Sequence, residues 1–209
     1  MSFPFDDSFR THVAARCMAF RRDETLVDQA LKHAAVAITL VESEAQDGQT
    51  AFLLTQRAAN LRAHGAQYAL PGGRCDPGET AIEAALRELH EELGVAADPV
   101  DVLGVLDDYP TRSGYLVTPV VVWARRAAHI LANPEEVAHV HRIRLAEIAA
   151  EDAISFAAIP ESDRPLVRLA ILGDHIHAPT AALLYQFREV IAGRDTRVAH
   201  LEQPVFAWR

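Results

Sequence analysis

Three glutamates that stand close together are the residues best suited to chemistry in this 209-residue chain. Glu88, Glu91 and Glu92 occupy positions i, i+3 and i+4 of a segment with helical periodicity, so their carboxylates share one helix face. Like charges at this spacing destabilise a bare helix, and a bound cation is the natural compensation, although a solvated acidic face is the alternative. Oxygen ligands of this kind suit Mg²⁺ or Mn²⁺, which keep several waters and bridge to substrate phosphates. We therefore expect a divalent-metal site that serves phosphate chemistry.

The sequence around these glutamates predicts a helix over residues 81–93. Thr80 followed three residues later by Glu83 is typical of a capping box, in which the two side chains satisfy amides of the first turn. The segment consists of good helix formers with apolar residues at helical spacing, and Gly94 suits the left-handed conformation that ends a helix. The glutamates are therefore expected on a helix that follows a loop.

The helix belongs to a longer motif that begins at Gly73. Residues 73–95 read GRCDPGETAIEAALRELHEELGV, which is G-x5-E-x7-R-E-U-x-E-E-x-G-U with U apolar. An ion pair between Arg87 and Glu79 would fix the loop to the helix. The motif resembles the signature of the Nudix hydrolases, which cleave nucleoside diphosphates linked to another group. The resemblance implies that the three glutamates, with the Gly73 carbonyl in addition, bind the divalent ions.

The resemblance also implies a hydrolytic mechanism. Divalent ions would neutralise a pyrophosphate and lower the pKa of a water that attacks one phosphorus in line. Glu88 and Glu136 are both candidates for the base that takes the proton, and Glu91 is placed with them at the catalytic centre. Glu136 is chosen because an acidic residue outside the signature often completes the site in this family, and Glu135 is the next choice. The alternative is that both are solvated residues before a strand.

A basic stretch, residues 57–73, precedes the motif and is too irregular for one element. It lies just ahead of the predicted metal helix, where cationic groups can contact an anionic substrate. The alternative is an ordinary surface loop. The candidates for substrate binding are Arg57, Arg62, His64 and Gln67.

A narrower resemblance covers residues 53–73, which are similar to the upstream motif of the coenzyme A pyrophosphatase branch, roughly LLTxRx3LRxHxGQxxFPGG. The run SGYLVTPVV at residues 113–121 is similar to the bacterial members. Two letters differ, because Ala66 and Leu70 stand where that motif has Gly and Phe. The resemblance implies hydrolysis of coenzyme A to 4′-phosphopantetheine and adenosine 3′,5′-bisphosphate. Hydrolysis of ADP-ribose, NADH or a dinucleotide is one alternative, and a domain that senses a nucleotide without cleaving it is another.

Composition sets the class of protein and of partner. The net charge of −9 argues against a general nucleic-acid-binding surface, so we expect a small nucleotide-diphosphate substrate instead. No run of about 18 apolar residues occurs, and we expect a cytoplasmic protein without a membrane partner. Cys17 and Cys75 are too few for a disulfide scaffold, and an inert loop cysteine is favoured over a catalytic thiol at Cys75. A homodimer through the terminal segments stays open.

The predicted elements give an α/β fold class, which the resemblance specifies as a Nudix-type α/β/α sandwich with a mixed central sheet. We expect a core domain at residues 34–160, an N-terminal helical extension at residues 1–33 and a C-terminal helical extension at residues 161–209, packed on the same domain. Pro119 suggests an edge or a bulge in its strand. Residues 174–177, DHIH, could bind zinc, but a lid or substrate-contacting loop is favoured. The predicted strands are residues 34–41, 50–56, 100–106, 115–125, 137–143 and 204–208, and the further predicted helices are residues 145–150 and 179–191.

Overall fold

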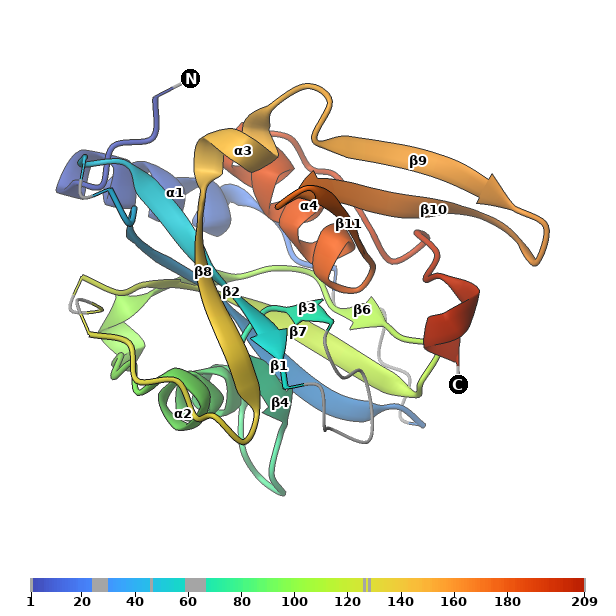
Figure 1. Ribbon diagram of the computed structural model, residues 1–209, viewed down its shortest axis with the longest axis horizontal. Helices are drawn as coiled ribbons and strands as arrows, with labels where there is room; N and C mark the ends of the chain where they lie inside the picture. The colour runs from blue at the N-terminus through green and yellow to red at the C-terminus, as the bar shows by residue number, and fades with distance from the viewer. Residues whose placement is uncertain are drawn as a thin grey trace.

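A mixed β-sheet forms the centre of the molecule, as Figure 1 shows. The computed structural model describes residues 2–23, 30–45, 47–58, 67–125, 127 and 129–208. The strands of this sheet are β1 (Lys32–Glu42), β2 (Thr50–Arg57), β3 (Tyr68–Ala69), β4 (Gly72–Arg74), β5 (Val102–Val105), β6 (Tyr109–Pro110), β7 (Tyr115–Trp123) and β8 (Val137–Arg144). Their order is β3-β2-β1-β7-β5, with β4 on β1, β6 on β7 and β8 on β2. β1 and β7 run parallel, whereas the other pairs are antiparallel.

Helices cover both faces of the sheet. One face packs on α2 (Ala81–Leu93), and the other packs on α1 (Asp7–Ala19), α3 (Leu145–Ala149) and α4 (Thr180–Ile191). Strand β1 shows the division, because Ile38 and Leu40 belong to the core under α1 and α4, whereas Ala37 and Val41 belong to the core under α2. A strand covered on both faces needs a nearly continuous apolar sequence, which explains the run AAVAITLV. The predicted α/β/α sandwich is confirmed.

The N-terminal segment forms one described helix. Asp6 caps α1, since its Oδ1 accepts a hydrogen bond of 2.8 Å from the Phe9 amide. Cys17 is buried where α1 crosses β5, and a Cβ on Gly104 would lie 2.5 Å from the Cys17 Cβ. Burial raises the pKa of the Cys17 thiol to about 12, so this cysteine packs as an apolar group. No described helix is long and apolar enough to cross a bilayer.

Pro119 occupies an interior strand, so of the two predicted alternatives, an edge or a bulge, the edge is wrong; the register shift between β5 and β7 falls close by, opposite Val121 and Val122. β7 lies between β1 on one side and β5 and β6 on the other. Val117 pairs with β6 and Val120 pairs with β5, and Pro119 falls between these two partners. Its carbonyl accepts a hydrogen bond of 3.0 Å from the Leu106 amide. Proline has no N–H to donate, and the sheet tolerates it here because Pro119 lies where the pairing of β7 passes from β6 to β5.

The C-terminal segment contains a second sheet that the sequence interpretation missed. Strands β9 (Ile154–Ile159), β10 (Ser162–Ile171) and β11 (Asp174–His177) are antiparallel in the order β11-β10-β9. α4, which was predicted, packs against β10 and β11, and the β9–β10 hairpin extends beyond the body of the molecule in Figure 1. The predicted final strand is wrong, since Val205–Trp208 form a 3₁₀ helix after Pro204, which cannot donate to a ladder. The division of the chain at residues 34 and 161 stays a prediction.

Candidate active site

The signature helix α2 begins and ends as its sequence predicts. The Thr80 hydroxyl accepts the Glu83 amide at 3.2 Å, and the Glu83 carboxylate accepts the Thr80 amide at 2.8 Å. Gly94 adopts φ 65° at the other end, a left-handed conformation that favours glycine. Both caps, and therefore the capping-box prediction, are confirmed. The caps fix where α2 begins and ends.

The three signature glutamates differ in their exposure. Glu92 is only 3% exposed, Glu88 is half-buried, and Glu91 is exposed. Leu89 and Leu93 on the same helix are buried in the core, so Glu92 lies at the boundary between this core and the site. The structure therefore holds one carboxylate in a poorly solvated position, where a charge needs a partner.

Two glycines bring the backbone of β4 against these carboxylates. A Cβ on Gly73 would lie 2.3 Å from the Glu88 Oε1, and a Cβ on Gly72 would lie 2.2 Å from the Ala35 carbonyl oxygen. Gly72 also has φ 153°, and its amide donates to the Glu92 Oε2 at 3.3 Å. No other residue type fits either position without displacing β1 or a signature carboxylate. The structure thus places Gly73 directly beside Glu88.

Arg87 connects the loop to the helix. Its Nε donates to the Glu79 Oε1 at 2.9 Å, and its Nη2 donates to the Glu79 Oε2 at 3.0 Å, which confirms the predicted ion pair. The Nη1 of Arg87 lies 2.9 Å from the Glu88 Oε1 and 3.1 Å from the Glu91 Oε2. These contacts raise the pKa of Arg87 and tie two of the three signature carboxylates, Glu88 and Glu91, to its guanidinium group.

The charges in this cluster perturb the carboxyl groups. Burial raises the pKa of Glu92 to about 7; Arg57 and the Gly72 amide oppose the shift, whereas Glu88 and Glu136 add to it. Burial also raises the pKa of Glu88, and Arg87 partly offsets this effect while Glu136 again adds to it. The structure therefore brings Glu136 within electrostatic reach of Glu88 and Glu92. Its backbone is fixed there, because the Glu136 carbonyl accepts the Ala58 amide at 2.9 Å.

This group of side chains suits a hard divalent cation. The donors are carboxylate oxygens, and two of them have a raised pKa, so an added positive charge would relieve their repulsion. Within the part of the chain that the structure describes, no three His, Cys, Asp or Glu side chains already converge as a metal cluster. Arg87 accounts in part for the lack of such a cluster, since its guanidinium group pairs with Glu88 and Glu91.

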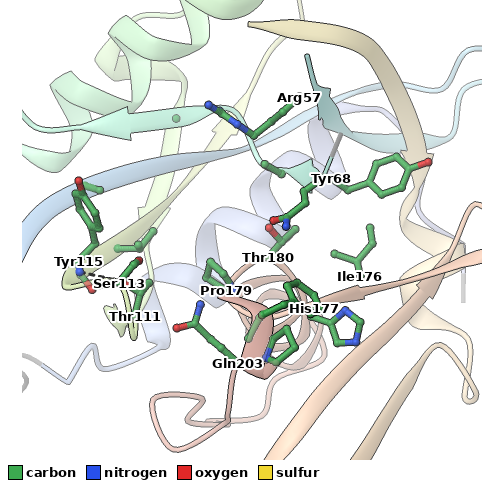
Figure 2. Close-up of a pocket in the computed structure, with 18 of the residues that line it drawn as sticks. Arg57, Tyr68, Thr111, Ser113, Tyr115, Ile176, His177, Pro179, Thr180 and Gln203 are labelled. Atoms are coloured by element: carbon green, nitrogen blue, oxygen red, sulfur yellow. Dashed lines mark hydrogen bonds between the residues drawn. The ribbon is translucent and has the colours of Figure 1, made fainter. Parts of the chain in front are cut away.

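A cavity of about 600 Å³ adjoins these residues. One end is lined by Arg57 and by Gly72, Gly73 and Arg74 of β4. Residues 174–180 and three residues of the tail line the opposite part, and Figure 2 shows Arg57 far from His177 and Gln203. A volume of this size is typical of a site for a nucleotide-sized ligand.

The predicted substrate-binding residues fall into two groups. Arg57 and Gln67 line the cavity, the Arg57 amide donates to the Gln67 carbonyl at 3.0 Å, and the Arg57 Nη1 lies 3.9 Å from the Glu92 Oε1. Arg62 and His64 lie outside the described residues. Cys75 is half-buried near the signature loop, and burial and Glu79 raise the pKa of its thiol, which disfavours the nucleophilic thiolate.

The tail residues that line the cavity had the weakest sequence signal. Residues 174–177 were favoured as a substrate-contacting loop; they line the cavity, but as strand β11. Gln203, Pro204 and Phe206 were not singled out for the site, because only the folded chain shows that the tail returns to the signature.

The fold and the site together define a class of protein. It is an α/β/α sandwich with an acidic helix beside a nucleotide-sized cavity. The NUDIX domain family matches residues 31–168, which is more than half of the chain. The chain therefore belongs to the Nudix family, and the prediction of that family is confirmed.

Curated relatives match about half of the chain. An uncharacterized Nudix hydrolase NudL from Enterobacter sp. (strain 638) is 42% identical over 117 residues, 56% of this chain and 59% of the relative. Nudix hydrolase 3 of Caenorhabditis elegans is 41% identical over 106 residues, 49% of this chain and 44% of the relative. The chain thus spans less than two thirds of the length of these relatives.

A solved structure supports the fold. The Nudix hydrolase RenU from M. smegmatis aligns with a TM-score of 0.50 and 23% identity, over 77% of this chain and 86% of its own. An alignment at this identity bears on the fold alone.

Proposed function

We propose that this protein hydrolyses the pyrophosphate bond of a nucleoside diphosphate derivative, with Mg²⁺ or Mn²⁺ as cofactor and coenzyme A as substrate. The products are 4′-phosphopantetheine and adenosine 3′,5′-bisphosphate. The observation that carries the proposal is the meeting of buried Glu92, Arg57 and the Gly72–Gly73 backbone at one end of a nucleotide-sized cavity. A site that combines a carboxylate with a guanidinium group suits a divalent cation together with anionic phosphates. The carboxylate attracts the cation, and the guanidinium attracts the phosphates.

The ligands of the cation are proposed as Glu88, Glu91, Glu92 and the Gly73 carbonyl. A divalent ion held by these groups supplies positive charge to the pyrophosphate and lowers the pKa of water. The close approach of Gly73 to Glu88 supports this set, because backbone and carboxylate oxygens then come from both sides of one site. Arg87 orients the carboxylates of Glu88 and Glu91.

The chain's own residues position the substrate and accept the proton. Arg57 binds phosphate oxygens at the cavity end that it lines, where its guanidinium also faces Glu92. Water forms a bond to one phosphorus, the bond from that phosphorus to the bridging oxygen breaks, and the water's proton passes to a carboxylate. Glu88 and Glu136 are both candidates for that base, since both belong to the same electrostatic cluster.

Coenzyme A is proposed from the loop before the signature. Arg57 and Gln67, which match the motif of the coenzyme A branch, line the cavity together. Arg62 and His64 are proposed as further contacts of the same loop. A cytoplasmic location, a small-molecule partner and a homodimer stay predictions.

The test is product analysis by chromatography after incubation with coenzyme A, ADP-ribose and NADH in parallel, first with Mg²⁺ and then with Mn²⁺. We expect adenosine 3′,5′-bisphosphate from coenzyme A to form fastest. Hydrolysis of only the other compounds would reject the substrate and keep the chemistry. Failure to cleave any nucleoside diphosphate derivative would reject the chemistry and favour a nucleotide sensor.

A further inference from the structure

The C-terminal segment builds the wall of the cavity that faces away from the signature. Residues 174–180 of β11 and the start of α4 line it, together with Gln203, Pro204 and Phe206. In Figure 2, Arg57 stands at one end of the drawn side chains, and His177 and Gln203 stand at the other. A ligand whose phosphates lie at Arg57 would therefore extend its organic part toward β11 and the tail.

Two aromatic rings meet on this wall. The rings of His177 and Phe206 are 5.8 Å apart and nearly perpendicular, at 87°. His177 is half-buried, whereas Phe206 is 62% exposed although it lines the cavity. A large exposed aromatic ring beside a cavity is apolar surface that a ligand can cover. Perpendicular rings offer both a face and an edge, which suits a third flat ring better than a linear chain.

The polarity of the cavity changes from one end to the other. Arg57 and Arg74 supply positive charge at the signature end, whereas Asp174 is exposed at the β11 end. Near His177, the lining includes buried Ile176 and Ala178. Burial, Arg168 and His175 lower the pKa of His177, so the ring is neutral at neutral pH. Phosphate is thus attracted to one end, and an uncharged ring is accepted at the other.

An ion pair between the buried Glu202 and the partly exposed Arg112 anchors the tail that forms part of this wall. Glu202, next to Gln203, accepts hydrogen bonds from Arg112, and from the Ser162 hydroxyl at 2.7 Å. The Gln203 side-chain oxygen accepts the Arg112 amide at 2.6 Å. The tail is therefore fixed to β10 and to the loop before β7 at Glu202 and Gln203, a few residues before Phe206.

We propose that His177 and Phe206 form a base subsite, which holds the purine ring of a nucleotide whose phosphates lie at Arg57 and the signature. The subsite rests on the proposed function for the position of the phosphates. It makes the C-terminal segment a determinant of substrate choice, since the same hydrolytic centre would act on whatever nucleotide this wall accepts.

The test uses equilibrium binding, which does not depend on turnover. Titration calorimetry with 5′-AMP and with ribose 5-phosphate compares the intact protein with His177→Ala and Phe206→Ala. Each substitution should weaken AMP binding about 10-fold, because a stacked base loses one aromatic partner. Ribose 5-phosphate, which has no base, should bind all three proteins equally. His177→Phe keeps a ring and should bind AMP within about 3-fold of the intact protein.

Phe156→Ala is the matched control. Phe156 is an exposed aromatic residue of the same segment that packs on Tyr185, outside the cavity lining. This variant should leave AMP binding unchanged, and thermal melting checks that every variant is folded.

Three results would overturn the subsite: intact protein that does not bind AMP, AMP binding that survives both alanine substitutions in folded protein, or equal losses for AMP and ribose 5-phosphate. The two proposals fail separately. If AMP binding depends on His177 but no pyrophosphate is cleaved, the base subsite stands and the enzymatic proposal falls. If coenzyme A is cleaved while AMP binding ignores both rings, only the subsite falls.

Discussion

Two glutamates of this protein are almost equally buried and yet differ in every other respect. Glu92 on α2 is 3% exposed, and Glu202 in the tail is 1% exposed. Glu92 has one amide at 3.3 Å and one guanidinium nitrogen at 3.9 Å. Glu202 accepts two hydrogen bonds from Arg112, and others from the Ser162 hydroxyl and the Gln203 amide.

The difference in partners reverses the direction of the pKa shift. Arg112, Ser162 and the Gln203 amide outweigh burial and hold the pKa of Glu202 at about 2. Burial dominates at Glu92 and raises its pKa to about 7. A buried carboxylate with a full set of donors stays ionised, whereas burial disfavours the charged form of one with few donors. The first anchors the tail that lines the cavity, and the second is the carboxylate that we propose to hold the cation.

Glu92→Gln should have the largest effect on turnover. The amide keeps the shape of the side chain but removes the charge that is proposed to hold the cation. We expect hydrolysis of coenzyme A in Mg²⁺ to fall by at least about 100-fold, because a metal contributes several kcal/mol to such reactions. The unfolding free energy without metal should not fall, since a poorly solvated charge is removed.

The control for this change is Glu151→Gln, which removes an exposed glutamate outside the cavity lining. It should keep full activity. Near wild-type turnover in Glu92→Gln would show that the contrast between the two buried glutamates has no catalytic meaning.

The sequence sufficed for much of the fold because local signals and packing agree. The capping box at Thr80 and the glycine at position 94 determine α2 to the residue. β1 and β2 were predicted because apolar runs need cover on both faces. Strand β10 escaped prediction because charged residues and Pro165 interrupt its alternation, and β9 and β11 are short segments that pair with it. Their pairing depends on contacts that no local pattern encodes.

The candidate site was predictable where one motif carries it. Gly73 and the three glutamates are close in sequence, and the ion pair of Arg87 with Glu79 was predicted from spacing. The second wall could not be predicted in the same way. The tail that carries Phe206 is anchored near the cavity by Glu202 and Arg112, two residues that are 90 positions apart. Such long-range ion pairs leave no periodic signal in a single sequence.

Arg112→Ala should have the largest effect on stability. It leaves the Glu202 carboxylate buried without its main partner, and we expect the unfolding free energy to fall by about 3 kcal/mol. Urea denaturation measures the change. Arg144→Ala is the matched control, because Arg144 is as exposed as Arg112 but pairs with the partly exposed Asp47. That loss should be smaller than the loss in Arg112→Ala, because water screens an exposed pair. Equal losses in the two variants would mean that burial of the acid does not affect how much its ion pair contributes to stability.

The pH dependence of stability should report on Glu202. Its pKa is lowered on folding, so its contribution is present above pH 4.5 and is lost as pH falls toward about 2. Glu202→Gln should therefore be less stable than the intact protein by about 2 kcal/mol at pH 6, and the difference should shrink at pH 3. Urea denaturation of both proteins at these two pH values measures it. A difference that grows in acid would contradict the sign of the shift.

Mg²⁺ should produce the smallest effect, and one that discriminates between the two acids. At ten times its dissociation constant, a cation that binds only the folded state adds about 1.4 kcal/mol of stability. The melting temperature of the EDTA-treated intact protein at pH 8 should therefore rise by a few degrees when Mg²⁺ is added. Glu92→Gln should lose most of this rise, whereas Glu202→Gln should keep it, because Glu202 already has its donors within the protein. An equal rise in both variants would place the cation away from α2 and separate the raised pKa of Glu92 from metal binding.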